Sequence, residues 1–173
     1  MPIAIDFGTC NTVVARWNPQ KKCAENLCVQ GLSRSFPFQT ETCTGSATVI
    51  PSLIHYGARD SRLLGEQVIS EGLVNHPGTF CWLKMDMLKG ARWVSSCHGQ
   101  KITPPKGATD LVGDVLAHTL GQTEQDQEEI VATVPVEAGD TYVDWLRTAV
   151  ASASGLRRIS IIDEATACIL GYQ

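Results

Sequence analysis

The sequence predicts an α/β protein in which a mixed β-sheet is flanked by helices. In the C-terminal third, apolar runs alternate with segments of helical period, giving strand, helix, strand and helix at 129–135, 137–155, 157–163 and 164–172. The two apolar runs are nearly continuous, as is typical of parallel strands covered on both faces, and their connection is long enough for a right-handed crossover. At the N-terminus, two β-prone runs surround a short glycine-containing turn, which predicts an antiparallel hairpin of residues 3–6 and 12–17.

The segments after this hairpin are expected to be extended or irregular. Residues 24–31 are predicted to form a third strand, and the Ser/Thr-rich residues 33–47 a loop or a linker between subdomains. Residues 48–57 are β-branched and apolar. Because proline has no amide hydrogen to donate, a strand here is expected to begin after Pro51 or to lie at an edge of the sheet.

The middle of the chain is expected to be mainly helical. Short helices are predicted at 63–73 and 76–90, a small hairpin at 93–107, an amphipathic helix at 108–122 with Thr109 as its N-cap, and a solvated acidic connection at 123–129. The tryptophans at 82, 93 and 145 are expected to be packing residues.

Composition narrows the classes of function. The chain has 173 residues, 43% of them hydrophobic, which is enough for one medium domain or two small lobes with a core. A net charge of −4 argues against a broad nucleic-acid surface. The first residues do not form a signal peptide and no apolar stretch is long enough to cross a bilayer, so we expect a cytoplasmic protein without a membrane partner. The seven cysteines contain no CxxC pair and are expected to be free thiols rather than zinc ligands.

Carboxylates follow two of the predicted strands. Asp6 ends the first strand, and Asp163 and Glu164 end the last. In open α/β sheets, ligands bind beyond the carboxyl ends of strands, so these acids are candidates for a shared site. The turn at Gly8 and Thr9 has two interpretations at this point, a plain hairpin turn or a turn that holds phosphate.

The ordered motifs resemble a known family. "IAIDFGTCNTVVARW" resembles the first phosphate-binding motif of the superfamily of actin, sugar kinases and heat-shock ATPases. "VIPSLIHY", "LLGEQV", "HPGTFCWLKMDMLKG" and "IVATVP" followed by "IIDEATACILGY" are similar, in order and spacing, to the seventy-kilodalton heat-shock (DnaK-like) chaperones. The resemblance implies a ribonuclease-H-like sheet with an inserted α+β subdomain. Residues 1–47 and 123–173 would form subdomain IA, and residues 48–122 subdomain IB.

The resemblance also implies a chemistry, hydrolysis of ATP to ADP with Mg²⁺. Asp6 matches the aspartate that holds the metal, usually through water. Lys84 matches the lysine near the terminal phosphate, and Glu164 the glutamate that orients the attacking water. The phosphate-binding turn comprises the backbone of Gly8, Thr9, Cys10 and Asn11.

The sequence departs from the family pattern at several positions. Cys10 stands where the family has a hydroxyl residue, Asn11 replaces an aromatic residue, and Asp163 and Ala165 flank the key glutamate with unusual neighbours. Motifs for a second lobe and for a peptide-binding domain are not found. We therefore expect a lobe of a longer protein, with only half of the nucleotide site and no ATPase activity by itself.

The expected partners are a nucleotide, the second lobe and, through the parent protein, co-chaperones and unfolded peptide. Two alternatives stay open. One is a nucleotide-dependent filament subunit like the rod-shape-determining bacterial actins, whose Gly-Thr-x-Asn-Thr turn this chain shares. The other is a decayed ATPase lobe that serves as an interaction module.

Overall fold

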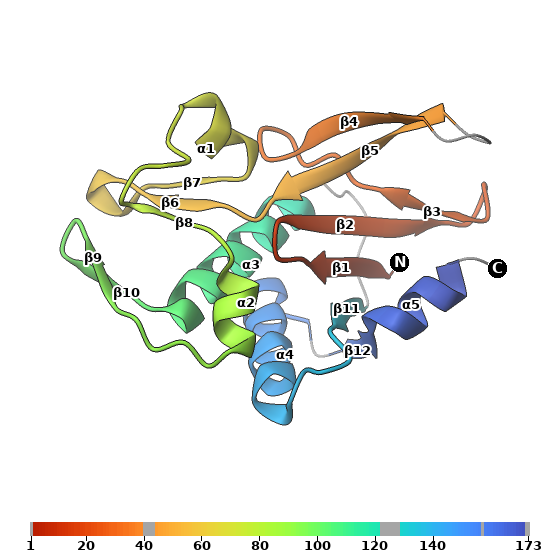
Figure 1. Ribbon diagram of the computed structural model, residues 1–173. Helices are drawn as coiled ribbons and strands as arrows, with labels where there is room; N and C mark the ends of the chain where they lie inside the picture. The colour runs from red at the N-terminus through yellow and green to blue at the C-terminus, as the bar shows by residue number, and fades with distance from the viewer. Residues whose placement is uncertain (1, 40–43, 122–128, 157, 172–173) are drawn as a thin grey trace.

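A seven-stranded mixed sheet forms the larger part of the molecule (Figure 1). The computed structural model describes residues 2–39, 44–121, 129–156 and 158–171. The strands are β1 (Ile3–Phe7), β2 (Asn11–Asn18), β3 (Cys23–Asn26), β4 (Arg34–Gln39), β5 (Thr44–Pro51), β6 (Ile54–Tyr56), β7 (Arg62–Leu64), β8 (Thr79–Phe80), β9 (Ser95–Cys97), β10 (Gln100–Ile102), β11 (Ile130–Val134) and β12 (Ile159–Asp163). The helices are α1 (Glu66–Ser70), α2 (Leu83–Leu88), α3 (Pro104–Gly121), α4 (Asp140–Ser154) and α5 (Glu164–Gly171), with a 3₁₀ turn at Ala58–Asp60.

The large sheet has β1 near its centre. Its order is β12-β11-β1-β2-β5-β4, and β3 pairs with the other end of β2. The pairs of β1 with β11 and of β11 with β12 are parallel, whereas β1–β2, β2–β5 and β4–β5 are antiparallel. The predicted mixed sheet flanked by helices is therefore confirmed.

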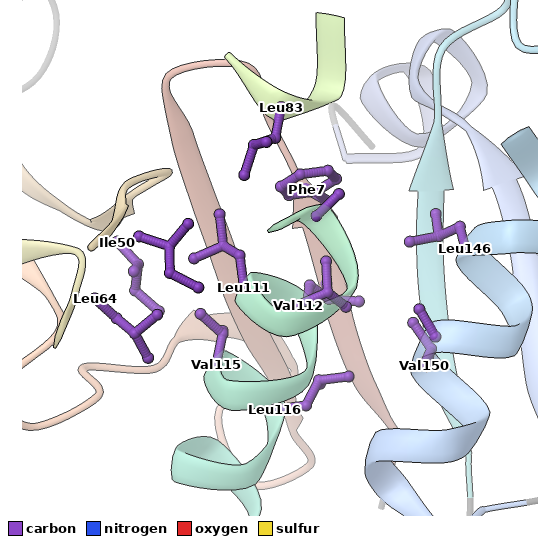
Figure 2. Close-up of a cluster of buried hydrophobic side chains, with 14 of the residues drawn as sticks. Phe7, Ile50, Leu64, Leu83, Leu111, Val112, Val115, Leu116, Leu146 and Val150 are labelled. Carbon is purple, nitrogen blue, oxygen red and sulfur yellow. The ribbon is translucent and has the colours of Figure 1, made fainter. Parts of the chain in front are cut away.

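The core lies between this sheet and the helices α3 and α4. Along β1, Ile3, Ile5 and Phe7 are buried while the residues between them are not, which is the two-residue period of a strand. Figure 2 shows side chains from α3, among them Leu111 and Leu116, meeting this face of the sheet. Each fully buried aliphatic side chain contributes about 1.5–3 kcal/mol to the free energy of folding, so this packing holds β1 and its neighbours firmly in place.

Two of the helical predictions, at 108–122 and 137–155, are correct in kind and differ at the boundaries. The predicted helix at 137–155 is α4, and it ends at Gly155, which adopts φ 68° in the left-handed region that favours glycine. The predicted helix at 108–122 is α3, which begins four residues earlier at Pro104, because proline is well tolerated in a first helical turn. Thr109 therefore lies inside the helix and is not its N-cap; its hydroxyl accepts a hydrogen bond from Trp145 Nε1 at 2.9 Å.

Four other predictions are corrected. The segment 33–47 is not a loop, because β4 and the first half of β5 form a hairpin there. The segment 76–90 contains β8 and the short α2 in place of one helix, and the predicted strand at 24–31 is shortened to β3. Trp82 is not a packing residue, since 62% of its surface is exposed. The small hairpin expected at 93–107 is confirmed as β9–β10.

A second, three-stranded sheet follows the large one in the order β7-β6-β8. The predicted subdomain boundary at residue 47 lies inside β5, and the smaller sheet begins with β6. It is joined to α3 by side chains: Tyr56 donates to Asp110 at 2.7 Å, and Arg62 binds Asp114 through two nitrogens. The acidic segment 123–129 lies almost wholly outside the described residues. No described helix is both long and apolar enough to span a bilayer.

We expect the free energy of unfolding to fall as the pH drops below about 6.5. Burial, together with the nearby imidazoles of His76 and His98, lowers the pKa of His55 from its ordinary value of 6.5. The folded protein thus favours neutral His55, so its contribution to stability is complete above the pKa of the unfolded chain and is lost as the pH falls through and below that value. Urea unfolding between about pH 8 and pH 5 measures the change. The variant His55→Gln should flatten it, and equal slopes in the two proteins would contradict this assignment.

Candidate functional site

The carboxyl ends of three parallel strands lie at one edge of the large sheet. Ile5 of β1 is paired with Ala132 of β11, and Val134 of β11 is paired with Asp163 of β12. Asp6 and Glu164 therefore lie at the same edge of the sheet, separated by the width of β11. Neighbouring strands are about 4.8 Å apart, so the two backbone positions are roughly 10 Å apart. Both side chains can reach a ligand placed between them.

The Asp6 carboxylate is oriented by the neighbouring strand. The hydroxyl of Thr133 on β11 donates a hydrogen bond to Asp6 Oδ1 at 2.7 Å. This bond holds one carboxylate oxygen in a partly buried position and leaves the other available for a ligand. Thr133 was not found from the sequence, because nothing along the chain links it to a residue 127 positions away.

The turn after β1 is built so tightly that only glycine fits at position 8. A Cβ atom on Gly8 would lie 2.1 Å from the carbonyl oxygen of Asn11, far inside any real contact. The turn is also clamped by Ser52, whose hydroxyl donates to the Gly8 carbonyl at 2.8 Å and whose amide donates to the Cys10 carbonyl at 2.8 Å. Buried Thr12 shares a further hydrogen bond with the Ser52 hydroxyl at 3.0 Å. These bonds occupy carbonyl groups of the turn and keep its backbone in one conformation.

The outer residues of the turn, Thr9, Cys10 and Asn11, line a cavity of about 310 Å³. Cys81 and the exposed Trp82 line the same cavity from the chain segment before α2. Cys10 and Cys81 are free thiols, and burial raises the pKa of Cys81. All four residues of the predicted phosphate turn thus have a defined place, with Gly8 inside the turn and the other three on its accessible side.

Lys84 is buried although its side chain carries a charge. Only 5% of its surface is exposed. The preceding Trp82 has φ 58°, a left-handed conformation that turns the chain into α2. Leu83 reaches into the core cluster that contains Phe7 (Figure 2), and Gly107 of α3 leaves it room, because a Cβ there would lie 3.0 Å from Leu83. The apolar anchor at Leu83 therefore fixes where the next residue, Lys84, must lie.

The Lys84 ammonium forms an ion pair with the carboxylate of Glu164. Glu164 is the first residue of α5, and its side chain is 39% exposed, so the pair has one buried and one partly solvated end. Asp163 is the N-cap of α5. Its carboxylate accepts hydrogen bonds from the amide and the hydroxyl of Thr166 at 2.8 Å and 2.7 Å. These hydrogen bonds lower the pKa of Asp163. Two residues proposed from separate motifs thus touch.

The side chains available as metal ligands at this edge decide whether Mg²⁺ fits there. Among the described residues, no group of three or more His, Cys, Asp or Glu side chains is arranged to hold a metal ion. Magnesium usually keeps several waters and needs one or two carboxylates when phosphate oxygens supply the rest. The single carboxylate of Asp6 therefore fits a hydrated ion held from the second coordination shell, and it does not fit a cage made by the protein alone.

A further buried polar group, the phenol of Tyr142, lies in the helix that follows β11. Tyr142 lies in the first turn of α4, and burial raises the pKa of its phenol, with the carboxylates of Glu164 and Asp6 adding to the effect. Sequence reasoning missed Tyr142, Thr133 and Ser52 alike, since the burial of the first and the hydrogen bonds of the other two arise only in the folded chain.

No family model matches the chain.

Proposed function

We propose that the chain is the N-terminal lobe of a DnaK-like ATPase and binds the phosphates of Mg²⁺-ATP with its half of the site. The observation that carries this proposal is the ion pair of Lys84 with Glu164. The two residues are 80 positions apart and were assigned to one site from two separate motifs. A glycine turn and an oriented aspartate at the same sheet edge support it.

Each residue has a role that its surroundings favour. The amides of the turn from Gly8 to Asn11 are suited to phosphate oxygens, because a tight glycine turn lets backbone approach the ligand. Lys84, released from its partner, neutralises charge on the terminal phosphate. Glu164 accepts a hydrogen bond from the attacking water and orients it. When bound, Mg²⁺ offsets the charge of the phosphates, and Asp6 holds it through water.

The proposal extends to the finer fold. The order of β1, β2, β11 and β12, with α4 between the last two, supports a ribonuclease-H-like subdomain IA. The small sheet, α1, α2 and the β9–β10 hairpin then belong to the inserted subdomain IB. The proposal includes a cytoplasmic parent protein.

A second lobe is part of the proposal, because in this family the nucleotide lies between two lobes. Helix α5 supports a partner on this side of the molecule: none of its residues is buried, and Ile169 and Leu170 are exposed. Co-chaperones and unfolded peptide would act through the parent protein. Half a site implies weak binding, with a dissociation constant of about 1 mM.

Calorimetric titration of Mg²⁺-ATP into the full chain tests this function. Asp6→Asn is the informative variant, since the amide oxygen still accepts the hydrogen bond from Thr133 while the charge is removed. We expect weak binding by the wild-type chain and at least about a tenfold loss in Asp6→Asn, because a charged second-shell ligand contributes that much.

The matched control is Asp144→Asn, which removes the same charge from an exposed position on α4. It should bind as the wild-type chain does. Equal binding by Asp6→Asn and the wild-type chain would contradict the proposed role of the turn. Heat that is absent even at millimolar nucleotide would favour the interaction module instead.

A further inference from the structure

Tyr142 carries a buried hydroxyl group without a hydrogen bond. The residue is 4% exposed, and the described part of the chain offers its hydroxyl no partner. The other buried tyrosine behaves differently, because the hydroxyl of Tyr56 donates to Asp110 at 2.7 Å. Buried polar groups in folded proteins are nearly always paired, so a buried phenol without a partner calls for an explanation, and a role in catalysis or binding is one of them.

The position of Tyr142 points to that partner. Helix α4 follows β11, the strand between β1, which carries Asp6, and β12, which directly precedes Glu164, so its first turn starts at the edge where both carboxylates lie. Both carboxylates act electrostatically on the phenol. The ring is packed against Trp145, with ring centroids 5.2 Å apart, and Trp145 is itself fixed by its hydrogen bond to Thr109. The ring is thus held in the first turn of α4, at the sheet edge that carries the site.

The ion pair of Glu164 with Lys84 is open to competition from a bound phosphate. In the ligand-free protein, Glu164 is neutralised by the buried ammonium of Lys84. A bound phosphate group competes with Glu164 for this ammonium, because Lys84 is the residue proposed to neutralise the terminal phosphate. Once Lys84 turns to phosphate, Glu164 loses its charged partner and requires another donor. The unpaired phenol of Tyr142, at the same sheet edge, is such a donor, and a hydrogen bond to an ionised carboxylate is among the stronger ones.

We propose that Tyr142 is a positioning residue that donates its hydroxyl hydrogen bond to Glu164 when Lys84 leaves that carboxylate for a bound phosphate. The inference rests on the proposed function for the identity of the ligand, Mg²⁺-ATP. The pairing of Tyr142 with Glu164 does not depend on that function. It adds a switch of partners to the site: Lys84 holds Glu164 at rest, and Tyr142 holds it in the working orientation.

The first test compares two Tyr→Phe variants of the full chain. Tyr142→Phe removes a hydroxyl that has no partner at rest, so the melting temperature without ligand should stay equal or rise. Its affinity for Mg²⁺-ATP should fall about tenfold, as expected when one hydrogen bond to a charged group is lost. Tyr56→Phe is the matched control: it loses the bond to Asp110, so its melting temperature should fall while its affinity is unchanged.

The second test observes the hydroxyl directly by NMR, with tyrosine labelled at Cζ. The signal absent from Tyr142→Phe belongs to Tyr142, and it should move when Mg²⁺-ATP is added at constant pH. It should also move without ligand in Lys84→Met, in which Glu164 has already lost its ammonium, and it should return in the double variant Lys84→Met/Glu164→Gln.

The outcomes separate the two proposals. An unmoved Tyr142 signal in ligand-free Lys84→Met overturns the pairing of Tyr142 with Glu164. Mg²⁺-ATP binding of equal strength in Tyr142→Phe and the wild-type chain overturns it as well. If the signal moves in Lys84→Met but the wild-type chain binds no Mg²⁺-ATP, the pairing stands and the proposed nucleotide function falls.

Discussion

Replacing Gly8 by alanine is expected to lower the free energy of unfolding by about 3 kcal/mol and to abolish binding of Mg²⁺-ATP. The new Cβ atom would lie 2.1 Å from the Asn11 carbonyl oxygen, so the backbone on one side of the turn must move. Ser52 opposes that movement, because it binds the carbonyl groups of Gly8 and Cys10. The turn then either loses these hydrogen bonds or keeps the clash, and both outcomes misplace the amides meant for phosphate.

Urea denaturation measures the stability and calorimetry the binding. The matched control is Gly121→Ala at the end of α3, where an added Cβ meets nothing within 4 Å and alanine favours the helix. This control should be neutral or slightly stabilising. A Gly8→Ala variant as stable as the wild-type chain would mean that the turn is looser than its geometry indicates.

Breaking the ion pair from its two ends is expected to give unequal effects. Glu164→Ala leaves the nearly buried Lys84 ammonium without its counter-charge and should cost about 2 kcal/mol, less than for a fully buried pair because Glu164 is partly solvated. Lys84→Met keeps the long apolar stem and removes the charge, so the stability should change by less than about 1 kcal/mol. Both variants should lose nucleotide binding.

Chemical denaturation of the two single variants and the double variant measures the coupling between the residues. In the double variant, most of the cost of Glu164→Ala should disappear, since no buried ammonium remains. Asp144→Ala, which breaks the exposed pair with Arg147, is the control and should leave the unfolding curve unchanged. Equal destabilisation by Glu164→Ala and Lys84→Met would show that packing, and not the buried charge, determines the stability here.

Much of the fold follows from local pattern. The strands β1, β2, β11 and β12 were predicted because their apolar residues are dense and flanked by turn residues. The hairpin of β4 and β5 was missed for a physical reason. Its strands pair mainly with each other, and Ser35, Phe36 and Pro37 are exposed, so the segment lacks the buried apolar face on which strand prediction depends. Pro104 and Pro105 resemble a turn by composition, although the first turn of a helix accepts them.

The site was predictable only in part. Asp6 and Glu164 stand out because each lies at the carboxyl end of an apolar strand, and Lys84 entered only through a resemblance of its surrounding motif. What the sequence could not reveal is which groups orient them. Thr133, Ser52 and Tyr142 are ordinary residues in ordinary local patterns, and their importance arises from the register of β1 with β11 and from where β5 ends.

The central position of β1 has a consequence for how the chain acquires its structure during synthesis. Ile3 pairs with Ile130, so the parallel neighbour of β1 is translated 130 − 3 = 127 residues later. At ribosomal rates of 5–20 residues per second, that interval is roughly 6 to 25 s. Throughout it, the edge of β1 that later pairs with β11 has no strand partner. The nascent chain therefore passes through a period in which a strand with three core side chains has an edge open to pairing with other chains.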